Sequence, residues 1–256
     1  MDTARGLSHA RIWTVLFTIV AVATSNVARA ADELPTQRRG AARVTVVNSA
    51  RLPYLAITPA AFKTQSRWPL IVFLHGGDQS GNDLELLKLN GPPKYALTNP
   101  GFPFVVVAPQ LPAGKIWNGD VVAGLTKQVV ARFRIDPSRV YLTGLSTGGY
   151  GVWDTAMKHP ERFAAVVPVS GGGDIVIPLH AQGAQLDALR SLSVWAFHGG
   201  ADTTVAPSES QRMVDQLRRI GAGDVSITIY SGAPHDIWSR VYDNDAVYNW
   251  MLARQR

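Results

Sequence analysis

The sequence predicts an α/β fold in which helices cover both faces of a doubly wound, mostly parallel sheet. Short runs rich in Val, Ile, Leu and Phe alternate along the chain with longer segments that have helical periodicity. Two of these runs, residues 69–74 and 104–108, are apolar throughout, which is typical of strands buried on both faces of a parallel sheet.

The predicted elements follow in order from residue 44. Strands at 44–48 and 54–58 are expected to form an antiparallel pair at one edge of the sheet. The remaining strands are predicted at 69–74, 104–108, 139–143, 164–169, 193–197 and 225–230. Helices are predicted at 83–89 (starting near Asn82), 121–134, 208–220 and 245–254.

One segment places a serine between a predicted strand and helix-compatible residues. The strand leads into Gly144-Leu-Ser146-Thr-Gly148, a G-x-S-x-G motif. In this setting the serine hydroxyl points out above the sheet edge, with the N-terminus of a helix beneath it. The two glycines keep the strained turn free of side chains. Ser146 is therefore our candidate nucleophile, although an ordinary Gly/Ser turn would have the same composition.

A serine hydroxyl becomes a good nucleophile only when a base removes its proton. His235 is our candidate base because it follows the last predicted strand, and loops at the carboxyl ends of parallel strands converge. His198, at the end of strand 193–197, is expected to be structural. His159 and His180 are expected at the surface. His75 precedes the serine and is expected to order its own loop.

The base in turn needs an acid to orient it. Asp202 has the best position, in a Gly-rich loop a few residues beyond a predicted strand. Asp174, after the strand that follows the nucleophile, is the main alternative. Asp224 precedes a strand, and Asp236 adjoins the base, so both are weaker candidates.

An oxyanion hole needs two N–H donors. The residue after the nucleophile supplies one, which is the amide of Thr147. The second is expected from the loop after strand 69–74, where a glycine lets the backbone approach the substrate closely. We assign it to Gly77.

Tryptophans are the candidate substrate-binding residues. Trp238 lies three residues past the base, and Trp117 lies in a loop after a strand, so both are expected to contact substrate. Trp153, on the helix after the nucleophile, is expected in the core.

Four motifs in the expected order carry a resemblance to a known family. They are Leu74-His-Gly-Gly77, the segment 135–153, Phe197-His-Gly-Gly-Ala-Asp202 and Pro234-His-Asp-Ile-Trp238. The chain resembles secreted α/β-hydrolases of the predicted-peptidase and esterase group, related to dienelactone hydrolase, poly(3-hydroxybutyrate) depolymerases and feruloyl esterases. The resemblance implies a carboxylic-ester hydrolase that forms an acyl-enzyme on Ser146. A serine peptidase of the prolyl-oligopeptidase-like type and a non-catalytic binding protein on the same fold are the alternatives.

The connection at 171–191 bears on the substrate. Many α/β-hydrolases insert a cap near this point, but some twenty residues suffice only for a loop with one short helix. We therefore expect no large cap domain and an open site that accepts small-molecule or polymer-linked esters.

The N-terminus has the features of an export signal. Arg5 and Arg11 accompany a short apolar run at 12–24, and Ala28-Arg-Ala30 is a small-residue cleavage site. We expect residues 1–30 to be a signal peptide, 31–42 a flexible lead-in and 43–256 the α/β-hydrolase catalytic domain. The protein is expected to be periplasmic or secreted, without stable membrane insertion; an uncleaved anchoring helix is the alternative.

Composition excludes several classes of protein. The chain has no cysteine, which excludes disulfides and a cysteine nucleophile. Its formal charge is +6, but the basic residues are dispersed, so no nucleic-acid partner is expected. No histidine pair has the spacing of metal ligands, and no G-x-G-x-x-G follows the first strand, so we expect no metal and no cofactor.

Overall fold

The computed structural model describes residues 42–47 and 52–256. The chain divides into two units, Met1–Arg38 and Arg39–Arg256, and every described residue belongs to the second. The signal peptide predicted at 1–30 lies outside the described residues, as does all of the predicted lead-in except residue 42. None of the helices in the described ranges is both long and apolar enough to cross a lipid bilayer.

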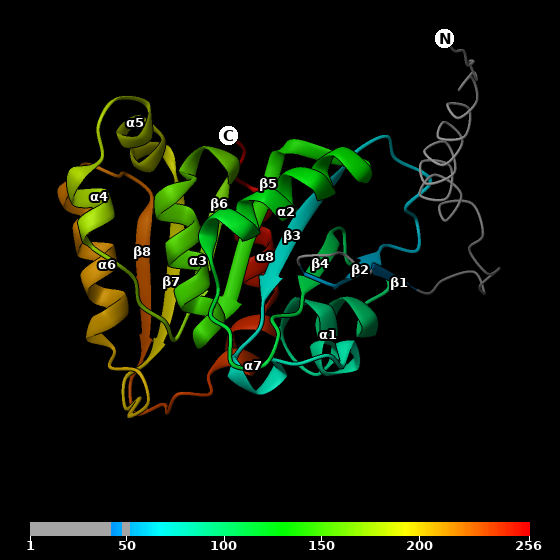
Figure 1. Ribbon diagram of the computed structural model, residues 1–256, viewed down its shortest axis with the longest axis horizontal. Coiled ribbons are helices and arrows are strands. Elements are labelled where there is room, and N and C mark those ends of the chain that lie inside the picture. Colours follow the sequence, from blue (N-terminus) through cyan, green and yellow to red (C-terminus); the bar gives the residue numbers. More distant parts are fainter. Residues whose placement is uncertain (1–41, 48–51) are drawn as a thin grey trace, which may run out of the picture. The chain divides into compact units, whose positions relative to one another are not determined.

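An eight-stranded sheet runs through the described part of the chain in the order β1-β2-β4-β3-β5-β6-β7-β8 (Figure 1). The strands are β1 (Arg43–Val47), β2 (Tyr54–Thr58), β3 (Trp68–Leu74), β4 (Val105–Pro109), β5 (Ile135–Leu145), β6 (Ala165–Val169), β7 (Ser193–Gly199) and β8 (Val225–Tyr230). β2 is antiparallel to both β1 and β4, and all pairs from β4 to β8 are parallel. The predicted doubly wound, mostly parallel sheet with an antiparallel edge is confirmed.

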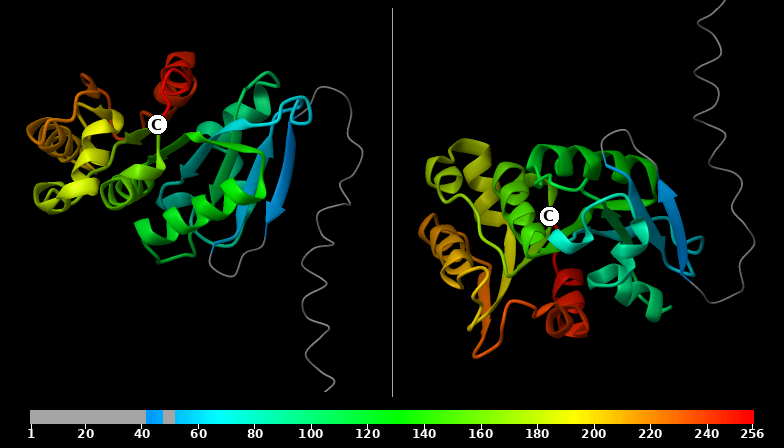
Figure 2. Two further views of the ribbon diagram at one scale, coloured as in Figure 1. Left: turned by 90° about the horizontal axis from the view of Figure 1, so that it is seen from above. Right: turned by 60° about the horizontal axis from the view of Figure 1, so that its bottom comes forward.

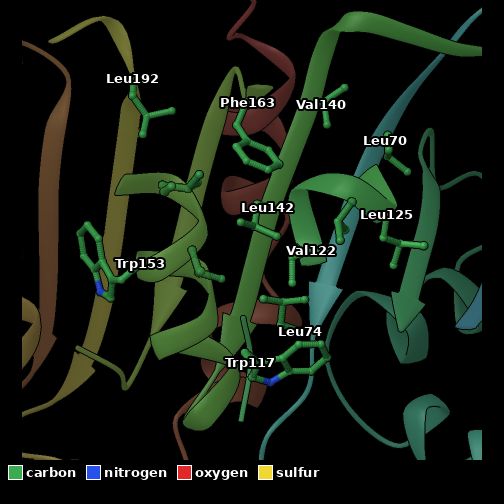
Figure 3. Packing of buried hydrophobic residues seen from close by; sticks show 14 of the residues in the cluster. Leu70, Leu74, Trp117, Val122, Leu125, Val140, Leu142, Trp153, Phe163 and Leu192 are labelled. Atoms are coloured by element: carbon green, nitrogen blue, oxygen red, sulfur yellow. The ribbon is translucent and has the colours of Figure 1, made fainter. Parts of the chain in front are cut away.

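Helices pack on both faces of this sheet (Figure 2). One face is covered by α2 (Gly119–Arg132), α3 (Thr147–Lys158) and α6 (Ser208–Arg219), and the other by α1 (Gly91–Thr98), α7 (Trp238–Tyr242) and α8 (Asp245–Leu252). Because successive strand side chains point to opposite faces, β3 contributes to both cores. Leu70 and Leu74 belong to the first core, part of which is drawn in Figure 3, whereas Ile71 and Phe73 belong to the second.

The helix that follows β4 begins where the sequence provides a cap. The side-chain oxygen of Asn118 accepts hydrogen bonds from the N–H groups of Asp120 and Val121, at 3.0 and 3.2 Å. These N–H groups have no acceptor within the helix, so the asparagine stabilises the first turn. α2 therefore begins at Gly119, two residues before the predicted start.

Two helical segments differ from the prediction. The segment predicted as a helix at 83–89 is the 3₁₀ helix η3 (Leu84–Lys88), and its capping side chain is Asp83, which accepts from Glu85 N, rather than Asn82. α1 was not predicted, because it is short and its first turn holds Pro92 and Pro93. Two further 3₁₀ turns are η2 (Gly77–Gln79) and η4 (Pro160–Arg162).

The connection between β6 and β7 holds two helices, where one was expected. α4 (Val176–His180) packs against α3 and α6, and α5 (Gly183–Ser191) packs against η4. α5 lies at the end of the sheet opposite to the carboxyl ends of the parallel strands (Figure 1). Both helices extend the outer layer, and no large cap domain is formed here.

Candidate active site

The topology of the sheet fixes where a site is expected. β3 and β5 are neighbours, but the chain leaves β3 toward β4 on one side and continues from β5 toward β6 on the other. In open α/β sheets, ligands bind at the carboxyl ends of the strands where the winding direction changes. The His75–Gly77 loop follows β3 and Ser146 follows β5, so both lie at this switch point.

Ser146 occupies the turn between β5 and α3 with a strained backbone. Its φ is 54° and its ψ −119°, a region that residues with a side chain rarely adopt. The surrounding structure holds it there: Ser146 N donates to Val169 O at 2.9 Å, and Tyr150 N donates to Ser146 O at 3.2 Å. This turn separates the hydroxyl from the regular strand and helix on either side.

The two glycines of the motif lie where backbone segments cross without space for a side chain. A Cβ on Gly148 would lie 2.0 Å from Leu74 O, and a Cβ on Gly144 would lie 2.6 Å from Gly148 O. Glycine at both positions therefore lets the start of α3 pack directly on the end of β3 beneath the serine.

Hydrogen bonds connect three of the predicted residues in series. His235 Nε2 lies 2.9 Å from Ser146 Oγ, and His235 Nδ1 lies 2.6 Å from Asp202 Oδ2. A carboxylate only accepts, so Nδ1 carries the ring proton and Nε2 is free to accept the serine proton. The structure thus brings together Ser146, His235 and Asp202 from the carboxyl ends of β5, β8 and β7.

Asp202 is held as a carboxylate in a buried position. Burial alone would raise its pKa, but hydrogen bonds from His235 and from the N–H groups of Val205 and Thr204 keep the pKa of this carboxyl below its usual value. The two N–H groups donate to Oδ1 at 2.8 and 2.9 Å, which leaves Oδ2 for the imidazole. The charge is therefore available to stabilise an imidazolium on His235.

Sequence reasoning missed one residue that holds the base. Ser170, directly after β6, donates its hydroxyl to His235 O at 3.0 Å, and its φ is 48°. Its own N–H donates to Phe197 O at 2.9 Å. The signal in the sequence was a serine at a strand end ahead of three glycines, but a positive φ at a serine gives no sequence pattern.

The other candidate acids lie elsewhere. Asp174 is exposed and accepts a hydrogen bond from Val176 N at 2.8 Å, and Asp224 pairs with Arg254 at 2.7 Å. Asp236 is exposed. The contact with His235 thus belongs to Asp202 among the acids considered.

The other histidines take separate positions. His75 Nδ1 donates to Gly76 O at 2.6 Å, and its Nε2 accepts from Leu111 N at 2.9 Å, so the ring orders the loop after β3. Burial lowers the pKa of His75, which favours this neutral form. His159 pairs with Asp120 at 2.7 Å, and His180 is exposed on α4. His198 is buried and contacts Asp202, the third member of the Ser146–His235–Asp202 triad.

The two residues predicted to donate N–H groups to an oxyanion hole both lie at helix starts. Thr147 is the first residue of α3 and Gly77 the first of η2, and the N–H of a first helical residue has no acceptor within its helix. The loop after β3 approaches the nucleophile closely, since a Cβ on Gly76 would lie 3.6 Å from Ser146 Cβ. The start of α3 adds the positive end of a helix dipole to this position.

A hollow of about 420 Å³ begins at Thr147 and runs along the exposed side of α3. Its walls come from the 115–117 loop, from α3 and from the 172–174 loop. Trp117 is one wall, but its ring is nearly buried: Nε1 donates to His75 O at 3.1 Å, and Gly151 leaves the space for it. Ile116 and Tyr150 are exposed at this hollow and give it an apolar rim.

Trp238 and Trp153 differ in environment. Trp238 is half-buried at the start of α7. Its ring makes an edge-to-face contact with the imidazole of His235, and the two ring centroids lie 5.4 Å apart. It does not line the hollow beside Thr147. Trp153 is fully buried in the core between the sheet and α3 (Figure 3).

No group of three or more His, Asp or Glu side chains with the arrangement of a metal site occurs in residues 42–47 and 52–256. The arrangement at Ser146 consists of a hydroxyl, an imidazole that can take its proton, a buried carboxylate and unpaired N–H groups nearby. These are the parts needed for acyl transfer through a serine.

The chain is similar to several known proteins. The model of the prolyl oligopeptidase family matches residues 115–179, which include Ser146. The poly(3-hydroxyalkanoate) depolymerase C of Paucimonas lemoignei is 30% identical over 218 residues, which is 66% of this chain and 50% of that protein. The chain thus spans about half the length of this curated relative.

Two solved structures share the fold. A thermostable esterase superposes with a TM-score of 0.69 and 27% identity, covering 85% of this chain and 64% of that one. A ferulic acid esterase superposes with a TM-score of 0.61 and 16% identity, covering 82% of this chain and 95% of that one. The fold is the α/β-hydrolase fold.

Proposed function

We propose that the chain is a carboxylic-ester hydrolase that works through an acyl-enzyme on Ser146. The observation that carries this proposal is the unbroken series of hydrogen bonds from Ser146 Oγ through both nitrogens of His235 to Asp202 Oδ2, at 2.9 and 2.6 Å. The order of donors and acceptors along this series is the one that activation of a serine by a base requires.

In this mechanism Ser146 Oγ attacks the ester carbonyl while its proton passes to His235 Nε2. The oxyanion that forms is stabilised by the N–H groups of Thr147 and Gly77. His235 then gives the proton to the leaving alcohol as the C–O bond breaks. A water molecule then hydrolyses the acyl-enzyme. His235 takes a proton from the water, and the water oxygen attacks the acyl carbon. Ser146 Oγ leaves as His235 returns the proton to it, and the carboxylic acid is released.

The hollow beside Thr147 is the proposed binding place of the acyl group. It starts at an oxyanion donor and has Trp117 and Tyr150 in its walls, so it suits an apolar or aromatic acyl group of several carbons. Trp238, in edge contact with His235, is proposed to border the alcohol side of the ester.

Parallel assays distinguish an esterase from a peptidase. Purified protein is given p-nitrophenyl esters of increasing acyl length and matched peptide anilides, with Ser146→Ala as the control. We expect hydrolysis of the esters at a kcat/KM at least about a hundredfold above that of the anilides, because an ester has the better leaving group. Faster anilide cleavage would favour the peptidase, an alternative raised by the prolyl oligopeptidase family match.

Two ester chemistries follow from the names of similar proteins. One is an oligomer of a 3-hydroxyalkanoate, the substrate in the name of the depolymerase relative, and the other is a feruloyl ester, as in the name of the structural neighbour. The rate of hydrolysis is measured on soluble forms of both substrates at equal concentrations, and the faster reaction assigns the acyl group. No turnover of either, with p-nitrophenyl ester activity retained, would remove both substrates from the proposal.

We further propose that the protein is exported and cleaved after Ala30. The support is the Ala28-Arg-Ala30 site behind a short apolar run in the sequence. Intact-mass analysis of the protein from a periplasmic extract tests this. A chain that keeps Met1 and sediments with membranes would contradict it.

A further inference from the structure

A second histidine lies against the acid of the triad. His198 is at the end of β7, and neither its side chain nor that of Asp202 has exposed surface. Its Nε2 lies 3.2 Å from Asp202 Oδ2 and 3.0 Å from Val205 O, and its Nδ1 lies 2.7 Å from Ser210 Oγ. Oδ2 of Asp202 therefore contacts two imidazole rings, because His235 Nδ1 lies 2.6 Å away from the same atom.

The neighbours of His198 Nε2 require a proton on this nitrogen. The oxygen of Val205 is a carbonyl and can only accept, and the carboxylate of Asp202 likewise accepts. A bare Nε2 would place three lone-pair acceptors together in a buried position, which is unfavourable. Nε2 thus carries a proton that is shared between the two oxygens.

The neighbours of Nδ1 require a second proton. Ser210 Oγ lies 2.7 Å from Gly171 O, a carbonyl to which it can only donate. A hydroxyl has one proton, so once it is given to Gly171 the oxygen can only accept from His198 Nδ1. If Nδ1 carried no proton, the hydroxyl proton of Ser210 would have to point at Nδ1 instead of at Gly171 O. Ser210 Oγ and Gly171 O would then lie 2.7 Å apart with no proton between them.

We infer that His198 is doubly protonated and forms a buried ion pair with Asp202, and that it is a positioning residue for the triad. A buried charge is tolerated when it is paired and all its hydrogen-bonding groups are used. Both conditions hold here: each nitrogen of His198 donates, and Asp202 accepts from two rings and two backbone N–H groups.

The other ionisable groups around the pair do not replace this charge balance. Partial burial of its ring and the nearby Glu209 carboxylate raise the pKa of Tyr150 on α3, so its phenol stays neutral. On α6, Glu209 pairs with Arg212 at 2.6 Å. Across the carboxylate lies His235, which is the group whose charge changes during the reaction. Asp202 is thus the anion in contact with His198.

The consequence for catalysis rests on the proposed function. A fixed positive charge against Asp202 Oδ2 disfavours a second positive charge on His235 across the same atom. The charge on His198 therefore opposes the imidazolium form of His235. Loss of the charge on His198 should move the acid limb of the pH–kcat/KM profile to higher pH by about one unit or more.

The protonation of His198 can be read without any assay of activity. Neutron diffraction from deuterated crystals at pH 7, or long-range ¹⁵N–¹H correlation of the histidine rings, locates the ring protons. We expect two protons on His198 and one, on Nδ1, for His235. A single proton on His198 would overturn the inference, whether or not the protein hydrolyses esters.

Variants at Ser210 test the link to the triad. Ser210→Ala removes the acceptor of Nδ1–H, so His198 should become neutral and the acid limb should move up by about one unit. Ser210→Thr keeps the hydroxyl and should keep the wild-type profile. If Ser210 instead donates to a neutral ring, Ser210→Ala leaves the limb in place, and this result would contradict the inference.

Thr126→Val is the matched control for loss of a buried hydroxyl. Thr126 Oγ1 donates to Val122 O of its own helix at 2.8 Å and has no contact with the triad. We expect a small loss of stability and no movement of the limb. A shift equal to that of Ser210→Ala would show that the effect comes from general destabilisation.

Discussion

Ser170 donates its hydroxyl to the carbonyl oxygen of His235 at 3.0 Å and so ties the end of β6 to the loop that carries the base. Ser170→Ala should lower kcat by about tenfold with little change in KM, because a displaced imidazole impairs proton transfer more than substrate binding. Steady-state kinetics on a soluble ester measure this.

The control for this change is Ser226→Ala, which removes a hydroxyl that contacts Val194 O at 3.5 Å away from the site. Its kcat should equal that of the wild type. An unchanged kcat in Ser170→Ala would show that the loop holds His235 without this bond.

Asp202→Asn should lower kcat by about ten-thousand-fold, because the amide favours the wrong imidazole tautomer and cannot balance the imidazolium. Asp174→Asn is the matched control, since Asp174 is exposed and contacts Val176 N. It should retain nearly full activity. The reverse order of effects would move the role of the acid to Asp174.

The stability of the protein should depend on pH through Asp202. Its pKa is lowered in the folded state, so the carboxylate stabilises the fold above its unfolded pKa of about 3.9, and this contribution is lost as the pH falls through the folded value. The difference in unfolding free energy between wild type and Asp202→Asn should therefore shrink between pH 7 and pH 3. Urea denaturation at both pH values measures it, and a constant difference would contradict the assignment.

Gly148→Ala should destabilise the fold by about 3 kcal/mol, the upper end of the usual cost of overpacking, because the new Cβ would lie 2.0 Å from the backbone oxygen of Leu74, which cannot move without displacing β3. Urea denaturation measures this loss. Gly124→Ala is the control: it is exposed on α2 with open space around its Cβ position, and it should gain about 0.5–1 kcal/mol. Equal effects at the two positions would show that the crossing beneath Ser146 is not tight.

The sequence predicted the sheet well because its strands are continuous apolar runs. β4 (Val105–Pro109) and β6 (Ala165–Val169) are fully buried, so burial and composition coincide. The short helices were harder to predict. α1 has eight residues, with Pro92 and Pro93 in its first turn, and α4 has five, so neither is long enough to show a clear helical period.

Motif and chain order sufficed to propose Ser146, Asp202 and His235, because each follows a strand that ends at the same edge of the sheet. The partners of these residues could not be found in the same way. In the sequence His198 is recognisable only as a residue at a strand end, because its contact with Asp202 depends on the conformation of the loop after β7. The sequence places Trp117 in a loop, but its side chain is nearly buried against Gly151 of α3.

Active-site labelling tests the central claim most directly. The purified protein is treated with a fluorophosphonate, and the adduct is located by peptide mass spectrometry, with Ser146→Ala treated in parallel. We expect one adduct on Ser146, loss of ester hydrolysis in proportion to labelling, and neither labelling nor hydrolysis in the variant. An adduct on another serine, or ester hydrolysis that persists in purified Ser146→Ala, would contradict the account.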